Sequence, residues 1–251
     1  MQIAEKRCVA MIVEIREIEK INLKNPVVIE GFPGIGMIGP IGASFLASRP
    51  GMKLAGYISS PHFPPIAAIH DYKPVSPARI YASEKDNMIV VFSEFVIPAD
   101  IVLPLASELI DFAKKKKAKA IYSLAGIALE TPTDKVHAIA STPEMQTQLR
   151  GKSIDLIKEG ATQGVSGVLI AECAAQKFPA ANLMVETNKP LDPVGAARLL
   201  DVVGKLTGFK LDTKQLVSEG KQVEQNMKDA IQKMQSLHEN YQQMQQNPMY
   251  G

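Results

Sequence analysis

The chain has 251 residues, of which 46% are hydrophobic and 22% charged, and its formal net charge is +2. This composition is typical of a globular protein with one large or two small domains, and it excludes collagen-like, disulfide-scaffold and wholly disordered classes. The balanced charge gives no electrostatic footprint for nucleic acid. No apolar run reaches the roughly 18 residues of a membrane span. We therefore expect a cytoplasmic protein that binds neither nucleic acid nor membranes.

Strand-like apolar runs alternate with helix-like segments along most of the chain. Strands are predicted at 8–15, 26–30, 53–59, 66–70, 120–124, 136–140 and 183–186, and helices at 34–48, 99–117, 164–176 and 193–206. Asp192 is the predicted N-cap of the last of these helices. The runs 79–82 and 88–95 flank a turn-like cluster and predict a hairpin. Interleaved strands and helices are typical of an α/β fold, so we expect a mainly parallel, mixed sheet with helices on both faces.

The C-terminal segment differs in composition from the rest of the chain. Residues 215–251 hold nine of the fourteen Gln and four of the eleven Met. Apolar residues recur there at alternating spacings of four and three, which predicts an amphipathic, coiled-coil-like helix over 213–246. Residues 214–245 of it would extend roughly 48 Å. A lone helix with such a stripe needs a partner, either its own domain or neighbouring subunits. The predicted oligomer seam contains Leu216, Val223, Met227, Met234, Leu237 and Tyr241.

The chain is predicted to divide into an α/β core domain (1–212), the coiled-coil-like helix (213–246) and a flexible docking tail (247–251). Pro248 ends the helix and leaves Met249, Tyr250 and Gly251 at the tip. The tip offers an apolar side chain, a phenol and a terminal carboxylate, and partner proteins capture such carboxylates in grooves. A frayed end without function is the alternative.

A glycine motif follows the second predicted strand and opens the first predicted helix. Gly34, Gly36 and Gly39 have the G-x-G-x-x-G spacing of a dinucleotide-binding turn. However, residues 55–60 lack the acidic side chain that would hold a ribose hydroxyl, and prolines flank the glycines. We interpret the motif as a tight turn with close helix packing. A nucleoside- or dinucleotide-binding enzyme that uses residues 34–39 is the alternative. The signature residues of the turn are Gly31, Pro33, Gly34, Gly36 and Gly39.

No catalytic constellation is recognisable in the sequence. No Walker lysine follows the glycines, no G-x-S-x-G nucleophile elbow occurs, and the four His lack zincin-type partners. His62 lies in a proline-rich loop and is interpreted as structural, because no nucleophile or paired carboxylate is placed to work with it. Four acids, Glu94, Asp100, Glu130 and Asp134, are scattered along loop edges. We therefore expect no catalytic residue, no cofactor and no metal, and a protein that is not an enzyme.

Three stretches of the chain together resemble a known family. Residues 30–39 with Gly42-Ala43-Ser44, residues 164–172 and residues 186–200 are similar, in matching order, to the signature of the proteasome assembly chaperone family, specifically its archaeal homologues. The resemblance covers most of residues 10–210. It implies an α/β core similar to nucleoside phosphorylases but without their catalytic groups. It also implies a homo-oligomer. The 4–3 seam is compatible with two to five strands, and we expect roughly three to five subunits.

The tip of the chain resembles a docking motif. Met249-Tyr250-Gly251 matches the hydrophobic–Tyr–any pattern with which proteasome activators dock into the ring. By this resemblance, the tails reach the outer α-ring of the proteasome core particle, where the terminal carboxylate would pair with a lysine between α-subunits. Tyr250 would pack at the pocket mouth and favour an open gate, and Met249 would fill an apolar recess. The resemblance thus implies a non-enzymatic chaperone or activator that assists proteasome assembly or opens its gate.

Overall fold

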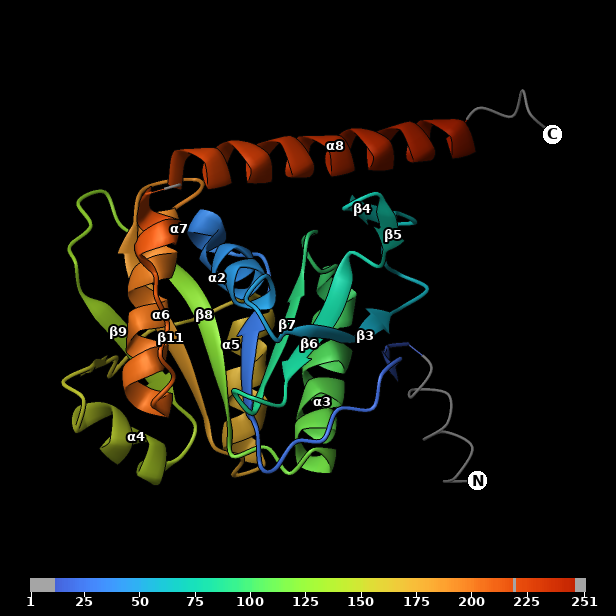
Figure 1. Ribbon diagram of the computed structural model, residues 1–251. Helices are drawn as coiled ribbons and strands as arrows, with labels where there is room; N and C mark the ends of the chain where they lie inside the picture. Colours follow the sequence, from blue (N-terminus) through green and yellow to red (C-terminus); the bar gives the residue numbers. More distant parts are fainter. Residues whose placement is uncertain (1–11, 219, 247–251) are drawn as a thin grey trace.

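A mixed β-sheet runs through the middle of the computed structural model, which describes residues 12–218 and 220–246 (Figure 1). The four central strands run parallel, whereas β6, β3 and β1 on one side and β9 on the other pair antiparallel with their inner neighbours. The predicted α/β fold with a mixed sheet is therefore confirmed. Within the described residues the sheet has nine strands, in the order β1 (Glu14–Glu17), β3 (Lys53–Ser59), β6 (Ala78–Ser83), β7 (Met88–Ser93), β2 (Val27–Gly31), β8 (Ala120–Ala128), β11 (Ala180–Thr187), β9 (Val136–Ala140) and β10 (Asp155–Leu156).

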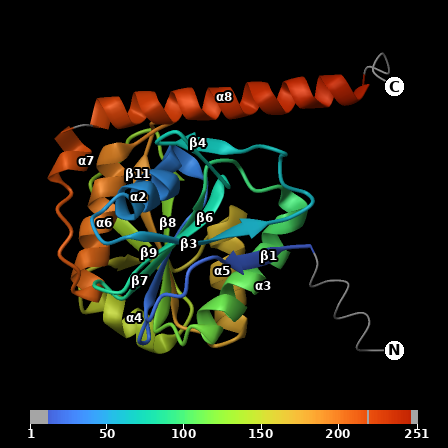
Figure 2. The same cartoon turned by 45° about the vertical axis from the view of Figure 1, so that its right-hand side comes forward.

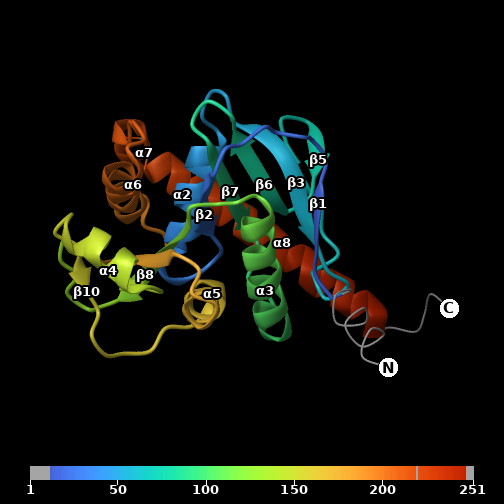
Figure 3. The same ribbon diagram turned by 90° about the horizontal axis from the view of Figure 1, so that it is seen from below.

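Helices cover both faces of the sheet, as the sequence predicts (Figure 3). One face is covered by α2 (Ile38–Ala47) and α6 (Pro193–Thr207), and the other by α3 (Ala99–Lys115) and α5 (Gly164–Ala175). Each face has its own hydrophobic core, one built on α2 and α6 and one on α3 and α5. The central strands β7 and β11 are consequently buried along their whole length, which explains their continuous apolar character.

The helix ends follow from local sequence signals. Asp192 is the N-cap of α6, because its Oδ1 accepts a hydrogen bond from the backbone N–H of Gly195 at 2.9 Å. The same helix ends at Gly208, whose φ of 80° favours glycine. In α3, Asp100 lies in the first turn and two lysines lie in the last, which complements the helix dipole at both ends.

Several elements differ from the sequence prediction. The predicted strand at 66–70 is shortened to β4 (Ala68–His70), and it pairs with β5 (Lys73–Val75) in a separate two-stranded sheet. The helix α4 (Pro143–Arg150) was not predicted, because its mostly polar sequence has only Met145 and Leu149 to bury. A capping signal was nonetheless present, since the Oγ1 of Thr142 accepts from the N–H of Met145 and a proline follows it. The first predicted strand begins at Glu14, and residues 8–11 lie outside the described part.

The predicted C-terminal helix is present as α7 (Lys214–Ser218) and α8 (Gly220–Gln246), on either side of residue 219. In both Figures 1 and 2, α8 lies across the end of the molecule to which the central parallel strands point. Two seam residues, Leu216 and Met234, are buried at 2% and 9% exposure in the two cores. The helix therefore packs on its own domain, which was one of the two predicted possibilities.

The seam is not uniformly buried. Met227 is half-buried against the core, whereas Leu237 and Tyr241 are 55% and 45% exposed. The side chain of Val223 lies outside the described part. The role of the seam in an oligomer stays a prediction. None of the helices described here combines the length and apolar character needed to cross a membrane.

Candidate functional site

The glycine motif forms the turn between β2 and α2. The chain passes through a short 3-10 segment, η1 (Ile35–Met37), in which Gly36 has a φ of 68°. This left-handed conformation favours glycine. The carbonyl of Gly36 accepts a hydrogen bond from the N–H of Asp192 at 2.9 Å, so the turn also fixes the start of α6.

Two other glycines of the motif let α2 lie directly against the sheet. A Cβ placed on Gly31 would lie 2.3 Å from the carbonyl oxygen of Gly39. A Cβ on Gly39 would lie 2.6 Å from the carbonyl oxygen of Phe32 and 2.8 Å from that of Leu124 in β8. These glycines face the protein's own backbone rather than an open surface. The geometry therefore supports the interpretation as a packing turn over that of a phosphate-binding loop.

Glu30 is a buried carboxyl group beneath the same turn. Its Oε1 accepts hydrogen bonds from the N–H of Phe32 at 2.8 Å and from the Oγ of Ser166 in α5 at 3.3 Å. Burial raises the pKa of Glu30, because desolvation disfavours the charged form. A raised pKa can mark a general acid, but Glu30 is only 1% exposed. The group therefore joins β2 to α5 and is not accessible to a substrate.

A crevice of about 460 Å³ lies where β2 and β7 end. These strands are parallel neighbours, yet β2 leads into α2 on one face and β7 leads towards α3 on the other. Such a topological switch point is where open α/β sheets bind ligands. Residues from 94–98 after β7 line the crevice together with Pro33 and Met37 after β2. The segment 62–66 and one face of α8 complete it.

Sequence reasoning did not identify this crevice, because its walls come from four distant segments. A signal was present in the prolines that gather in two of them, Pro64 and Pro65 in one and Pro98 in the other. Both segments are loops that follow a strand, β3 or β7, and binding residues are often found on loops that a rigid scaffold positions. The ring of Phe63 meets that of Phe95 edge-to-face, with centroids 4.9 Å apart and an interplanar angle of 70°.

Side-chain hydrogen bonds link the polar groups around the crevice. The Nδ1 of His62 lies 2.7 Å from the Oδ2 of Asp100, and the Nε2 of His70 lies 2.7 Å from the Oε1 of Glu94. The same Glu94 oxygen accepts from the Nη2 of Arg79, whose side chain is only 4% exposed. Each of these carboxylates thus contacts a basic group rather than a second carboxylate.

A second polar cluster joins β9 and β11. The Oε2 of Glu186 accepts from both the N–H and the Oγ1 of Thr133 at 2.6 Å, and its Oε1 lies 2.7 Å from the Nε2 of His137. These hydrogen bonds lower the pKa of Glu186 to about 2. The hydroxyl contacts the carboxylate instead of the imidazole, so the order of a nucleophile–base–acid triad is not met. The cluster anchors the loop that precedes β9.

This anchor predicts an acid-sensitive contribution to stability. The pKa of Glu186 is lowered in the folded state, so its stabilising effect is complete above the ordinary value of 4.5 and is lost as the pH falls towards about 2. We expect the difference in unfolding free energy between wild type and Glu186→Gln to be largest at pH 5–7 and to shrink by pH 3. Denaturant titrations at each pH measure it, with the exposed Glu159→Gln as control. A difference that does not change with pH would contradict the assignment.

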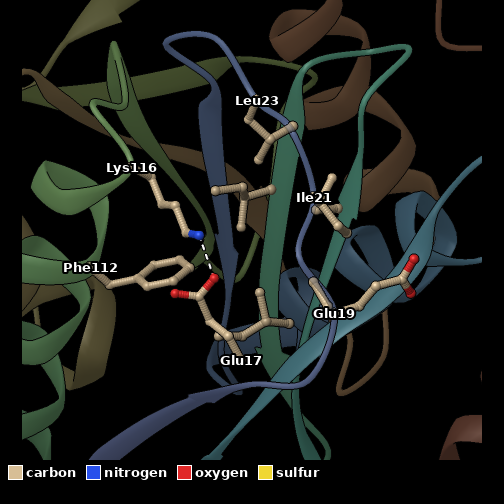
Figure 4. Close-up of a pocket in the computed structure, with 10 residues that line it drawn as sticks. Glu17, Glu19, Ile21, Leu23, Phe112 and Lys116 are labelled. Atoms are coloured by element: carbon tan, nitrogen blue, oxygen red, sulfur yellow. Dashed lines mark hydrogen bonds and ion pairs between the residues drawn. The ribbon is translucent and has the colours of Figure 1, made fainter.

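A small hollow lies under the segment that joins β1 to β2, between that segment and α3 (Figure 4). In the close-up, Glu17 and Lys116 point towards one another across it and form an ion pair, while Glu19 points away. The Nζ of Lys116 also lies 5.6 Å from the ring centroid of Phe112. The hollow has a volume of about 10 Å³, which is sufficient for about one water molecule. This contact ties the N-terminal segment to α3 and offers no ligand site.

The remaining predicted residues do not assemble a reactive centre. Asp134 pairs with Arg198, and the backbone carbonyl of Glu130 accepts from the amide of Asn188. Cys173 is buried, and desolvation raises its pKa to about 12, which keeps the thiol unreactive. Among the described residues, no group of His, Cys, Asp or Glu could hold a metal ion. Met249, Tyr250 and Gly251 lie outside the described residues.

The comparisons with known proteins agree with this architecture. The PAC2 family model matches residues 28–231. The chain is 30% identical over 212 residues to an uncharacterized protein of Methanocaldococcus jannaschii, covering 84% of this chain and 87% of that one. It is also similar to Pyrococcus furiosus PbaA, described as an archaeal homolog of proteasome-assembly chaperone, with a TM-score of 0.80 and 29% identity over 90% of this chain and 99% of that chain.

A more distant structure shares the fold. P. furiosus PbaB, described as an archaeal proteasome activator, superposes with a TM-score of 0.73 at 21% identity and covers 87% of this chain and 98% of that chain. The resemblance carried by residues 30–39 is thus confirmed at the level of the family. Because the family model spans most of the sheet and its helices, the chain belongs to the PAC2 family.

Proposed function

We propose that this protein is a non-enzymatic, cytoplasmic chaperone or activator of the proteasome that works as a homo-oligomer. The similarity to PbaA, at 29% identity over nearly the whole of that chain, supports a proteasome-related role. The non-enzymatic part of the proposal rests on the PAC2 family and on the similarity to PbaA, which is described as a homolog of proteasome-assembly chaperone.

The path of α8 is the observation that carries the docking part of the proposal. The helix crosses the end of the core and ends at Gln246, beyond β4 and β5 (Figures 1 and 2). The five residues that follow span at most about 17 Å. The position of α8 therefore decides where Met249, Tyr250 and Gly251 can reach, and we propose that they dock into the α-ring of the proteasome core particle.

Oligomerisation makes such a short motif effective. A tail of three residues buries little surface, so its own affinity is weak. Several tails on one oligomer raise the effective concentration and multiply avidity by about 10²–10⁴. We propose an oligomer of roughly three to five subunits.

Archaeal proteasome core particles test the proposal. The full chain is expected to co-sediment with them and to increase hydrolysis of a fluorogenic peptide. A chain that lacks residues 249–251 is expected to lose at least about tenfold in apparent affinity, because avidity multiplies each tail's contribution. Tyr250→Ala is expected to retain part of the binding and lose most of the stimulation. Tyr72→Ala, at a fully exposed tyrosine between β4 and β5, is the matched control.

The outcomes separate the two parts of the proposal. If the full chain neither co-sediments nor stimulates, the proteasome role is wrong. If the truncated chain performs as well as the full one, the tail mechanism is wrong and the wider role stands. If Tyr72→Ala fails like Tyr250→Ala, the effect of Tyr250 is not specific to the tail.

A further inference from the structure

The crevice at the ends of β2 and β7 has the size and position of a small-molecule site. Its volume of about 460 Å³ lies within the about 300–1,000 Å³ of typical ligand pockets. Both strands that open into it belong to the central parallel part of the sheet. Because the helices that follow them, α2 and α3, lie on opposite faces, neither fills the space directly above the strand ends. The space is instead roofed by α8.

Flat, apolar surfaces make up much of the wall. Phe63 and Phe95 meet edge-to-face, and Pro64 and Pro65 continue the same wall. Met234 closes it from α8. Rigid rings of this kind suit a planar guest, because aromatic rings stack on flat surfaces and a polarizable Met adapts to their edges.

One acceptor in the wall is held in place and only partly used. The side chain of Glu94 is 12% exposed. Its Oε1 accepts a hydrogen bond from the Nη2 of Arg79 and lies 2.7 Å from the Nε2 of His70. No hydrogen bond from the described residues reaches its Oε2. A carboxylate oxygen that is fixed at a cavity wall and has no donor from the protein can accept a charge-assisted hydrogen bond from an N–H group of a ligand.

From these features we propose that the crevice binds a planar heteroaromatic molecule that carries N–H donors on one edge, of the size of a purine base. The flat body lies between the phenylalanine and proline wall and α8, and the donor edge faces Glu94. This is a binding function without a chemical step. It does not depend on the proteasome role.

The probe for this proposal is 2-aminopurine, a fluorescent purine with an exocyclic amino group. We expect the full chain to quench its fluorescence saturably, with a Kd below about 1 mM, because stacking on rings and one charge-assisted hydrogen bond act together. Caffeine, a purine without any N–H donor, is expected to compete at least about tenfold more weakly, the factor that corresponds to one such hydrogen bond.

Two neighbouring glutamines on α8 give a matched pair of variants. Both are exposed, but Gln242 lines the crevice, with its Nε2 3.0 Å from the Nε2 of His238, whereas Gln243 does not line it. Gln242→Trp is expected to weaken 2-aminopurine binding about tenfold or more by filling the cavity. Gln243→Trp is expected to leave it unchanged. Excitation at wavelengths longer than the tryptophan absorption band prevents fluorescence from the added indole.

Three results would overturn the proposal: no saturable quenching by the wild type, equal competition by caffeine, or equal binding by the two tryptophan variants. The first two use the unaltered chain, so they remain decisive if Gln242→Trp fails to fold. Binding of 2-aminopurine is measured without proteasome, so its failure leaves the proposed function untouched.

Discussion

Replacing Gly39 with alanine is expected to destabilise the fold by about 3 kcal/mol, which lowers Tm by roughly 6–12 °C for a domain of this size. The added methyl would lie 2.6 Å and 2.8 Å from two carbonyl oxygens, those of Phe32 and Leu124. Leu124 lies within β8 and pairs with Leu183 of β11, so its carbonyl cannot move aside locally. Differential scanning calorimetry or guanidinium unfolding measures the loss.

Gly34 provides a control in the same turn. No atom lies within 4 Å of the position its Cβ would occupy, and its φ of −161° is an extended conformation that any residue adopts. Gly34→Ala is therefore expected to be neutral or to stabilise by about 0.4–1 kcal/mol through the unfolded state. Equal losses for Gly34→Ala and Gly39→Ala would show that the turn needs glycine for a reason other than packing.

The sequence predicted much of this fold because its strongest signals were local. Continuous apolar runs located β7, which is buried on both faces, and β3 and β9 match their predicted ranges. Glycine spacing after β2 located the turn into α2. Sequence patterns did not predict elements correctly where these bury few side chains. The polar α4 was missed, and β4 left the main sheet.

Sequence patterns could not predict contacts between segments that are distant in the chain. Glu94 was recognised only as a loop-edge acid, although its partner Arg79 lies on the neighbouring strand of the predicted hairpin. Glu186 was placed in a strand, but its binding to Thr133 depends on the fold of a loop 53 residues away. The heptad pattern predicted the helix α8 but not the surface on which it packs, because a stripe of apolar residues can pack on its own core or on another subunit.

The pair formed by Arg79 and Glu94 carries the second large prediction. The guanidinium of Arg79 is 4% exposed and lies over the ring of Phe92, with the Cζ 5.1 Å from the centroid. Its Nε and Nη1 have no hydrogen-bond partner among the described residues. Glu94 is therefore the main compensation for a nearly buried positive charge.

Glu94→Ala is expected to destabilise the protein by about 3–5 kcal/mol, because it leaves the Arg79 charge buried without a counter-charge. Adding Arg79→Met removes that charge, so the double variant is expected to recover most of the loss. Glu14→Ala, which breaks the exposed pair with Arg16, is the control and is expected to change little. Guanidinium unfolding of all three variants decides the question. If the double variant is no more stable than Glu94→Ala, the cost does not come from an unpaired charge, and Glu94 stabilises the fold through its packing alone.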